Sequence, residues 1–134
     1  MSGFSLHPRL AADTVFVADW ALSRVLAMND ARYPWLVLVP RQDSAVELFD
    51  LGADRRAILV EEIARAASGL KAMAASAKIN IGALGNLVPQ LHVHVVARSP
   101  GDAAWPGPVW GQGTAQPYEA EALSAFVARL RDGL

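Results

Sequence analysis

His92 and His94, two of the three histidines in this chain, stand two residues apart in an alternating stretch. From Gln90 to Val95 polar residues alternate with apolar ones, a period typical of a half-buried β-strand. Successive side chains of a strand point to opposite faces. The pattern therefore predicts that Gln90, His92 and His94 share one polar face, and we interpret that face as the candidate site.

The spacing of the two histidines suggests what they can do together. Residues two apart on a strand lie roughly 6.6 Å apart along its axis, which suits two imidazoles that contact different atoms of one small group such as a phosphate. A neutral imidazole nitrogen is a nucleophile or base near pH 7, and a protonated one is an acid. One histidine would attack while its neighbour holds or protonates the leaving group.

Two other interpretations of this spacing stay open. Two histidines on one strand face can bind a zinc ion, but a third ligand is then needed. His7 is the only other histidine, and the candidate carboxylates Asp13, Asp19 and Asp30 show no ligand spacing. The third interpretation is two polar strand residues without a site. Spacing alone does not choose among the three.

Composition narrows the class of protein. The 134 residues are the size of one domain, which we expect to span residues 1–134, and a hydrophobic fraction of 53% excludes a disordered chain. The net charge of -1 gives no general basis for binding nucleic acid or an anionic membrane. The absence of cysteine excludes disulfides, thiolate metal sites and cysteine nucleophiles. Without a signal peptide or an apolar run of membrane length, we expect a cytoplasmic protein.

The remaining elements must position the histidine strand. Hydrophobic patterns predict strands at residues 14–19, 21–28, 35–39 and 78–83 besides the histidine strand, with a tight hairpin between the first two. A long helix is predicted over residues 53–77 and a last helix from about residue 118 to 131. Residues 4–13 show no clear period, and a loop rich in Gly and Pro follows Arg98. This order favours an α+β fold with a five-stranded antiparallel sheet, one long helix and a C-terminal helix.

Several segments together resemble the histidine-triad (HIT) family. The stretch Gln90-Leu91-His92-Val93-His94-Val95-Val96 resembles its signature His-φ-His-φ-His-φ-φ, where φ is apolar, with Gln90 at the first histidine. Residues 26–30 and 35–41 are similar to the family's strand, turn, and strand that ends in Pro and a basic residue. Asn80 with Gly82, Gly85 and Asn86 resembles the segment before the signature, and residues 105–107 resemble a Trp-Pro stretch after it. The resemblance covers about residues 14–107.

The resemblance implies a HIT-like fold and a nucleotide hydrolase or nucleotidyl transferase. Its substrate would be a nucleoside phosphoramidate or a dinucleoside polyphosphate, cleaved at the α-phosphate. His92 would be the nucleophile and form a nucleotidyl-histidine intermediate, while His94 would hydrogen-bond the phosphate and assist the leaving group. The family is commonly homodimeric, and its chemical step needs no metal or other cofactor.

The resemblance also assigns roles in binding the nucleotide. Asp30, or its neighbour Asn29, would hold the ribose hydroxyls, and Asn80 would contact the phosphate or orient the nucleophilic imidazole. Apolar side chains of the first strands, Phe16 and Leu26, would sandwich the base.

Elementary chemistry agrees with this arrangement. A histidine nucleophile needs a free nitrogen, so its other nitrogen should donate to a fixed acceptor, either a backbone carbonyl or the Asn80 side chain. Backbone N–H groups of Asn86, Leu87 and Val88 precede the strand and could bind anionic oxygens. Gly85 would let the chain approach the phosphate closely.

Gln90 is the departure from the family signature. An amide can donate and accept hydrogen bonds but cannot carry a proton, so we predict a retained but altered catalytic site with Gln90 beside the two histidines. A second hypothesis is a nucleotide-binding or interaction protein with weak or no catalysis. Trp105 and Trp110, in the loop that follows the site, are candidates to close over it.

Overall fold

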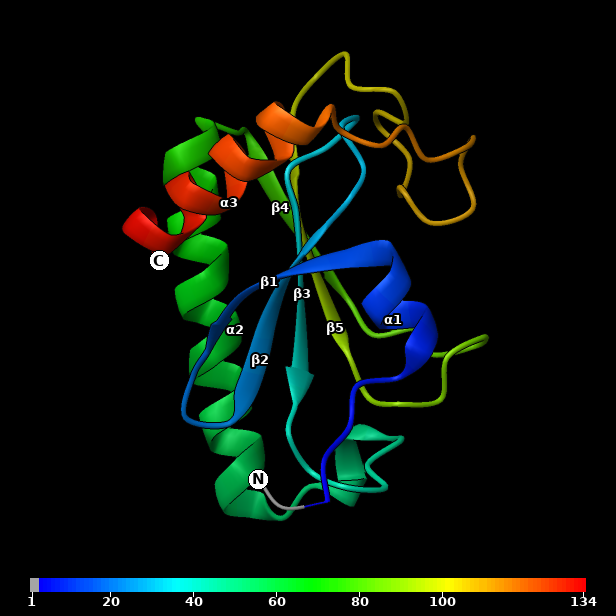
Figure 1. Cartoon of the computed structure of the whole chain (residues 1–134), viewed down its shortest axis with the longest axis vertical. Coiled ribbons are helices and arrows are strands. Elements are labelled where there is room, and N and C mark those ends of the chain that lie inside the picture. The colour runs from blue at the N-terminus through cyan, green and yellow to red at the C-terminus, as the bar shows by residue number, and fades with distance from the viewer. Residues whose placement is uncertain (1–2) are drawn as a thin grey trace.

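The computed structural model describes residues 3–134 as a five-stranded antiparallel sheet with three α-helices, which confirms the predicted α+β fold (Figure 1). The strands are β1 (Thr14–Asp19), β2 (Ser23–Met28), β3 (Trp35–Pro40), β4 (Lys78–Gly82) and β5 (Val93–Arg98). The helices are α1 (Pro8–Asp13), α2 (Ala53–Ala74) and α3 (Ala120–Gly133), with a short 3-10 helix η1 (Leu48–Asp50).

The sheet has the order β1-β2-β3-β5-β4, which places the histidine strand β5 between β3 and β4. Every residue of β3 and β5 is buried. In the antiparallel register His94 lies opposite Val37 on one side and Gly82 on the other. His94 is therefore fixed from both sides by backbone ladders, which gives its imidazole a rigid base.

Different helices pack on the two faces of the sheet. α2 and α3 pack on one face, and α1 lies on the other (Figure 1). The helical face carries the largest apolar cluster, to which β5 contributes Val95 and Ala97. The opposite face carries a second cluster that includes Leu10, Trp35 and Val96. His94 alternates with Val95 along β5, so its side chain belongs to the α1 face.

Helix ends differ from the sequence-based predictions by a few residues. α2 begins at Ala53 as predicted and ends at Ala74, because Ala75 adopts a left-handed conformation with φ of 50°.

In the middle of α2, the buried Glu62 carboxylate accepts the backbone N–H groups of Leu22 and Ser23. This contact ties the turn between β1 and β2 to the helix, and β2 begins at Ser23 rather than at Ala21.

α1 was not predicted, since a helix of six residues is too short to show a period. Its start nevertheless has a local cause. Pro8 occupies the first turn, where its missing N–H is harmless, and the His7 imidazole Nδ1 accepts the N–H of Arg9 as a cap. α1 matters because it covers the histidine face of the sheet.

The histidine strand begins later than the alternation predicts. β5 starts at Val93, and its ladder with β3 ends at the pair Leu38 and Val93. Before this point the Leu91 N–H donates to the carbonyl of Ala45, outside the sheet. Gln90 and His92 therefore precede the strand, and the prediction that they share a regular strand face with His94 was wrong.

No helix within residues 3–134 combines the length and the apolar character needed to cross a membrane.

Candidate active site

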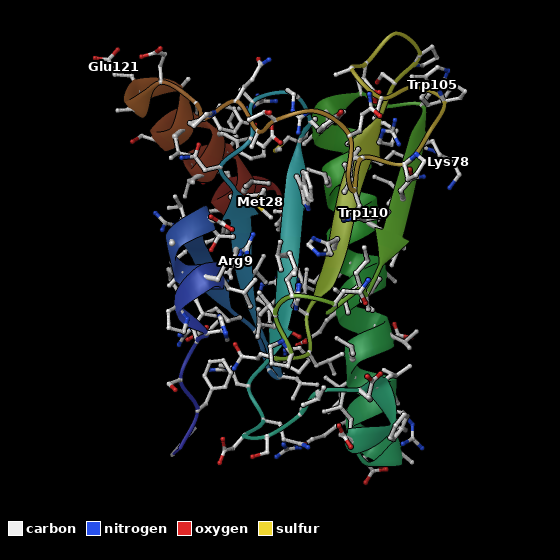
Figure 2. The ribbon with its side chains drawn as sticks, turned by 90° about the vertical axis from the view of Figure 1, so that its right-hand side faces the viewer. Arg9, Met28, Lys78, Trp105, Trp110 and Glu121 are labelled. Carbon is white, nitrogen blue, oxygen red and sulfur yellow. The ribbon has the colours of Figure 1, made fainter. Side chains whose placement is uncertain are left out.

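A cavity of about 680 Å³ lies on the α1 face of the sheet, and both His92 and His94 line it. Four other parts of the chain form its walls: α1, the segment from Met28 to Trp35, the connection from β4 to β5, and the segment from Val109 to Pro117. Figure 2 looks onto this face and shows Arg9 of α1 and Trp110 on opposite sides of β3. The histidines therefore face a space large enough for a nucleotide-sized ligand.

The surroundings of His92 fix its tautomer. Its Nδ1 lies 2.6 Å from the backbone carbonyl oxygen of Gln90. A carbonyl oxygen only accepts hydrogen bonds, so Nδ1 carries the proton and the neutral ring keeps its lone pair on Nε2. His92 thus has the arrangement that a histidine nucleophile requires, with a backbone carbonyl as the fixed acceptor.

His94 is held in the opposite tautomer. The indole Nε1–H of Trp35 donates to His94 Nδ1 at 3.0 Å, so the proton of the neutral ring sits on Nε2. Burial, and then the charge of neighbouring His92, lowers the pKa of His94 to about 4. Near pH 7 His94 is therefore a neutral hydrogen-bond donor through Nε2–H.

The two rings act as a complementary pair. Their centroids lie 4.9 Å apart in an edge-to-face arrangement. His92 has a lone pair on its Nε2, and His94 has an N–H on its own Nε2. Such a pair can attack an electrophilic centre and donate to an oxygen bound to that centre. Because His94 is neutral, it can stabilise negative charge without transferring a proton.

The connection before β5 supplies a wall of the cavity, as the sequence indicated. Gly85, Asn86, Leu87 and Val88 all line the cavity. Gly85 has a φ of 71°, a left-handed conformation that favours glycine. This connection is the part of the cavity where backbone N–H groups can approach an anionic ligand.

Asn29 and Asp30 also line the cavity, but Asp30 is already engaged. Its carboxylate accepts two side-chain N–H groups of Arg32 and the backbone N–H groups of Arg32 and Gln116. Burial alone raises the pKa of Asp30, yet these hydrogen bonds hold it below its ordinary value. Asn29 Oδ1 accepts the N–H of Tyr118. The turn after β2 therefore binds the segment that precedes α3.

Two polar residues expected at the site form other contacts. Gln90 does not line the cavity, because its side chain bonds the backbone of Ser5 and His7. Asn80 lies in β4, where its Oδ1 accepts Arg98 Nη1–H at 2.8 Å, and it does not line the cavity either. The acceptor for His92 is thus a carbonyl and not the Asn80 side chain.

The two side chains expected to sandwich a base also lie outside the cavity. Phe16 and Leu26 are cross-strand partners in β1 and β2. Phe16 is 46% exposed, whereas Leu26 is buried in the cluster beneath α1. Met28, two residues after Leu26 on the same face of β2, lines the cavity instead.

Trp35 lines the cavity and was not predicted as a residue of the site. Nothing in the sequence indicates that Trp35 contacts His94, a residue 59 positions away. Arg9, Leu10, Arg32 and Val109 also line the cavity without having been predicted. Trp110, a candidate to close over the site, lines it and packs edge-to-face on His94 with ring centroids 5.7 Å apart.

The donor chemistry of the site does not favour a metal ion. Within residues 3–134, no three His, Cys, Asp or Glu side chains gather closely enough to hold one. A metal on His94 Nε2 would also require the proton to move to Nδ1, which opposes the hydrogen bond from Trp35.

The family model and the solved structures that match this chain belong to one family. Residues 9–101 match the HIT domain family. A histidine triad protein of Bradyrhizobium japonicum is 50% identical, with 98% of each chain covered and a TM-score of 0.95. One from Sinorhizobium meliloti is 46% identical over 100% of this chain and 99% of its own, with a TM-score of 0.97. One from Marinobacter aquaeolei is 41% identical over 99% and 97%, with a TM-score of 0.96. No curated protein matches the chain.

Proposed function

The chain belongs to the HIT domain family, and we propose that it is a nucleotide hydrolase or nucleotidyl transferase that acts at the α-phosphate of a nucleotide conjugate. The observation that carries this proposal is the pair of opposite tautomers, with the His92 lone pair and the His94 N–H both on Nε2. The substrates we propose are nucleoside phosphoramidates and dinucleoside polyphosphates of the diadenosine tetraphosphate type.

In the first step, His92 Nε2 attacks the α-phosphorus and the bond from phosphorus to the bridging nitrogen or oxygen breaks. The leaving group departs with that bonding pair and takes its proton from solvent. The new nucleotidyl-imidazole is a cation, and its Nδ1–H remains hydrogen-bonded to the Gln90 carbonyl. This carbonyl therefore stabilises the charge that develops on the ring.

In the second step, a water molecule attacks the same phosphorus and the phosphorus–Nε2 bond breaks. The nucleoside monophosphate leaves, one proton passes to solvent, and the lone pair returns to His92 Nε2. Attack by an alcohol or phosphate in place of water gives nucleotidyl transfer. In both steps the His94 Nε2–H donates to a non-bridging phosphate oxygen, with the ring oriented by Trp35.

His92→Ala tests the proposal against His7→Ala as a matched control, because His7 is the one other histidine and does not line the cavity. We expect His92→Ala to release no nucleoside monophosphate above buffer from an adenosine phosphoramidate or diadenosine tetraphosphate, with an unchanged circular dichroism spectrum. His7→Ala should keep the wild-type kcat at saturating substrate, because it removes only the cap of α1. Equal activity of His92→Ala and wild type would remove His92 as the nucleophile.

A nucleotide-binding protein with weak or no catalysis is the second candidate. Gln90 favours this candidate, because it replaces the first histidine of the family signature and an amide cannot carry a proton. Turnover and affinity measured on the same adenosine and guanosine conjugates separate the two candidates. Tight binding with turnover no faster than buffer supports the binding protein.

Activity that survives exhaustive chelation removes the remaining alternative, a His-x-His metal site.

We also propose that the protein forms a homodimer by pairing of β4. β4 is an edge strand, and its Ile81 is 52% exposed. An exposed apolar edge strand favours pairing with another strand. Light scattering should give twice the chain mass for the wild type and a lower mass for Ile81→Lys.

A further inference from the structure

Gln90 contacts two separate parts of the chain with different atoms. Its Oε1 accepts the backbone N–H of His7 at 2.8 Å, and its Nε2 donates to the carbonyl of Ser5 at 2.9 Å. Its own backbone carbonyl accepts from His92 Nδ1 at 2.6 Å. We call the two side-chain hydrogen bonds the Gln90 clasp. One residue thus joins the N-terminal segment to the nucleophile.

The segment that the Gln90 clasp holds leads directly into a wall of the cavity. The carbonyl of His7 accepts the N–H of Ala11, and its imidazole caps the first turn of α1. α1 then contributes Arg9, Leu10, Ala12 and Asp13 to the cavity lining. A helix of six residues has little stability of its own, so its position depends on how its two ends are held. The clasp holds one end, and β1 holds the other.

We propose that Gln90 is a positioning residue that sets the α1 wall of the cavity relative to His92, and so determines affinity for the nucleotide; this rests on the proposed function. Gln90 does not touch the cavity, so it acts through α1 and not on the substrate. A residue of any type at position 90 keeps the carbonyl that orients His92. Loss of the clasp should therefore weaken binding of the nucleotide much more than it slows the chemical step.

Gln90→Ala removes both hydrogen bonds of the clasp, and His7→Pro removes only the one that the His7 N–H donates. Proline has no N–H, and the φ of -55° at His7 is close to the value that a proline ring imposes. His7→Ala is the matched control, because it loses the same imidazole cap as His7→Pro but keeps the N–H. Comparison of the two His7 variants isolates a single hydrogen bond to Gln90.

We expect Gln90→Ala to raise KM, and the Kd for adenosine monophosphate, by about threefold to tenfold relative to the wild type. His7→Pro should raise the same two constants by a similar factor relative to His7→Ala. The kcat should stay within about twofold in both variants. The double variant should be little weaker than Gln90→Ala with His7→Ala, since the hydrogen bond that His7→Pro removes is already absent in Gln90→Ala. Hydrogen exchange of the α1 amides should be faster in His7→Pro than in His7→Ala.

Two results overturn the inference. One is a fall in kcat for Gln90→Ala with KM unchanged, which would make Gln90 part of the chemistry. The other is equal hydrogen exchange of α1 in His7→Pro and His7→Ala. A wild type without turnover removes the proposed function instead, and the exchange comparison still decides whether the clasp holds α1.

Discussion

The indole Nε1–H of Trp35 donates to Nδ1 of His94 at 3.0 Å, across the neighbouring strands β3 and β5. This contact decides which nitrogen of His94 presents a proton to the cavity. The Gln90 carbonyl makes the opposite choice for His92. Two imidazoles that look equivalent in sequence are therefore different chemical groups in the folded protein.

Trp35→Phe tests the contact with His94. The variant keeps an aromatic ring but loses the N–H donor, so the neutral His94 can place its proton on Nδ1 and present an acceptor to the phosphate. We expect kcat to fall about tenfold, which is the effect of losing one hydrogen bond to a charged group, here the phosphate. Nitrogen-15 NMR of the imidazole should show the change of tautomer.

Tyr33→Phe is the control for Trp35→Phe. Tyr33 packs edge-to-face on Trp35, and its buried hydroxyl has no hydrogen-bond partner within residues 3–134. Its kcat should match the wild type. A similar loss of kcat in both variants would attribute the effect to packing and not to the hydrogen bond.

The pKa of His94 predicts how stability depends on pH. The folded side chain binds its proton only below about pH 4, whereas the unfolded side chain does so near pH 6.5. Between these values the unfolded state holds more protons, so the free energy of unfolding rises as pH increases from 4 to 6.5, by about 3 kcal/mol. Urea titrations should show that His94→Asn loses this rise. An equal slope in both proteins would contradict the lowered pKa.

The ion pair of Asp30 and Arg32 predicts a large loss of stability when it is broken. Their side chains are 2% and 11% exposed, so removal of the carboxylate leaves a largely buried guanidinium without a counter-charge. We expect Asp30→Ala to lower the free energy of unfolding by about 3 kcal/mol. Asp19→Ala breaks the more exposed pairs with Arg24 and Arg41 and should cost about 1 kcal/mol or less. Equal losses would show that Asp30 contributes no more than a surface charge.

Gly82 and Trp110 predict a double-variant effect on the cavity. A Cβ added at Gly82 would lie 3.0 Å from Cη2 and 3.3 Å from Cζ2 of Trp110, so Gly82→Ala should shift the indole, which packs on His94, by a few tenths of an ångström. We expect Gly82→Ala to raise KM and to shift the tryptophan fluorescence. Trp110→Phe lacks these two atoms, so Gly82→Ala should have much less effect in that background. Additive effects on KM would mean that the two residues act independently.

The strands of the sheet were predicted well because each strand shows its pattern of apolar and polar residues within its own sequence. The sequence could not predict the start of β5, because the alternation continues through Gln90 and His92, whereas the ladder with β3 ends at Leu38 and Val93 and the Leu91 N–H donates to Ala45 instead. α1 was missed because six residues do not show a helical period, although Pro8 and the capping His7 were visible signals. These errors lie where tertiary contacts, and not local pattern, decide the backbone.

The sequence predicted several residues that line the candidate site, but it did not predict their contacts. The two histidines and the connection from Gly85 to Leu87 line the cavity as expected. Asn80 and Gln90 have amide side chains suited to many partners, and only the fold shows that they bond Arg98 and the N-terminal backbone. The partner of His94 could not be predicted either, because Trp35 is distant in sequence.

The covalent intermediate tests the central claim most directly. The wild-type protein would be mixed with an adenosine phosphoramidate, quenched within milliseconds at alkaline pH, where phosphorus–nitrogen bonds to histidine survive, and digested for mass spectrometry. The account predicts an adenylyl group on His92 and none in His92→Ala. An adenylyl group on another residue, or turnover of the substrate with no covalent adduct at any quench time, would contradict it.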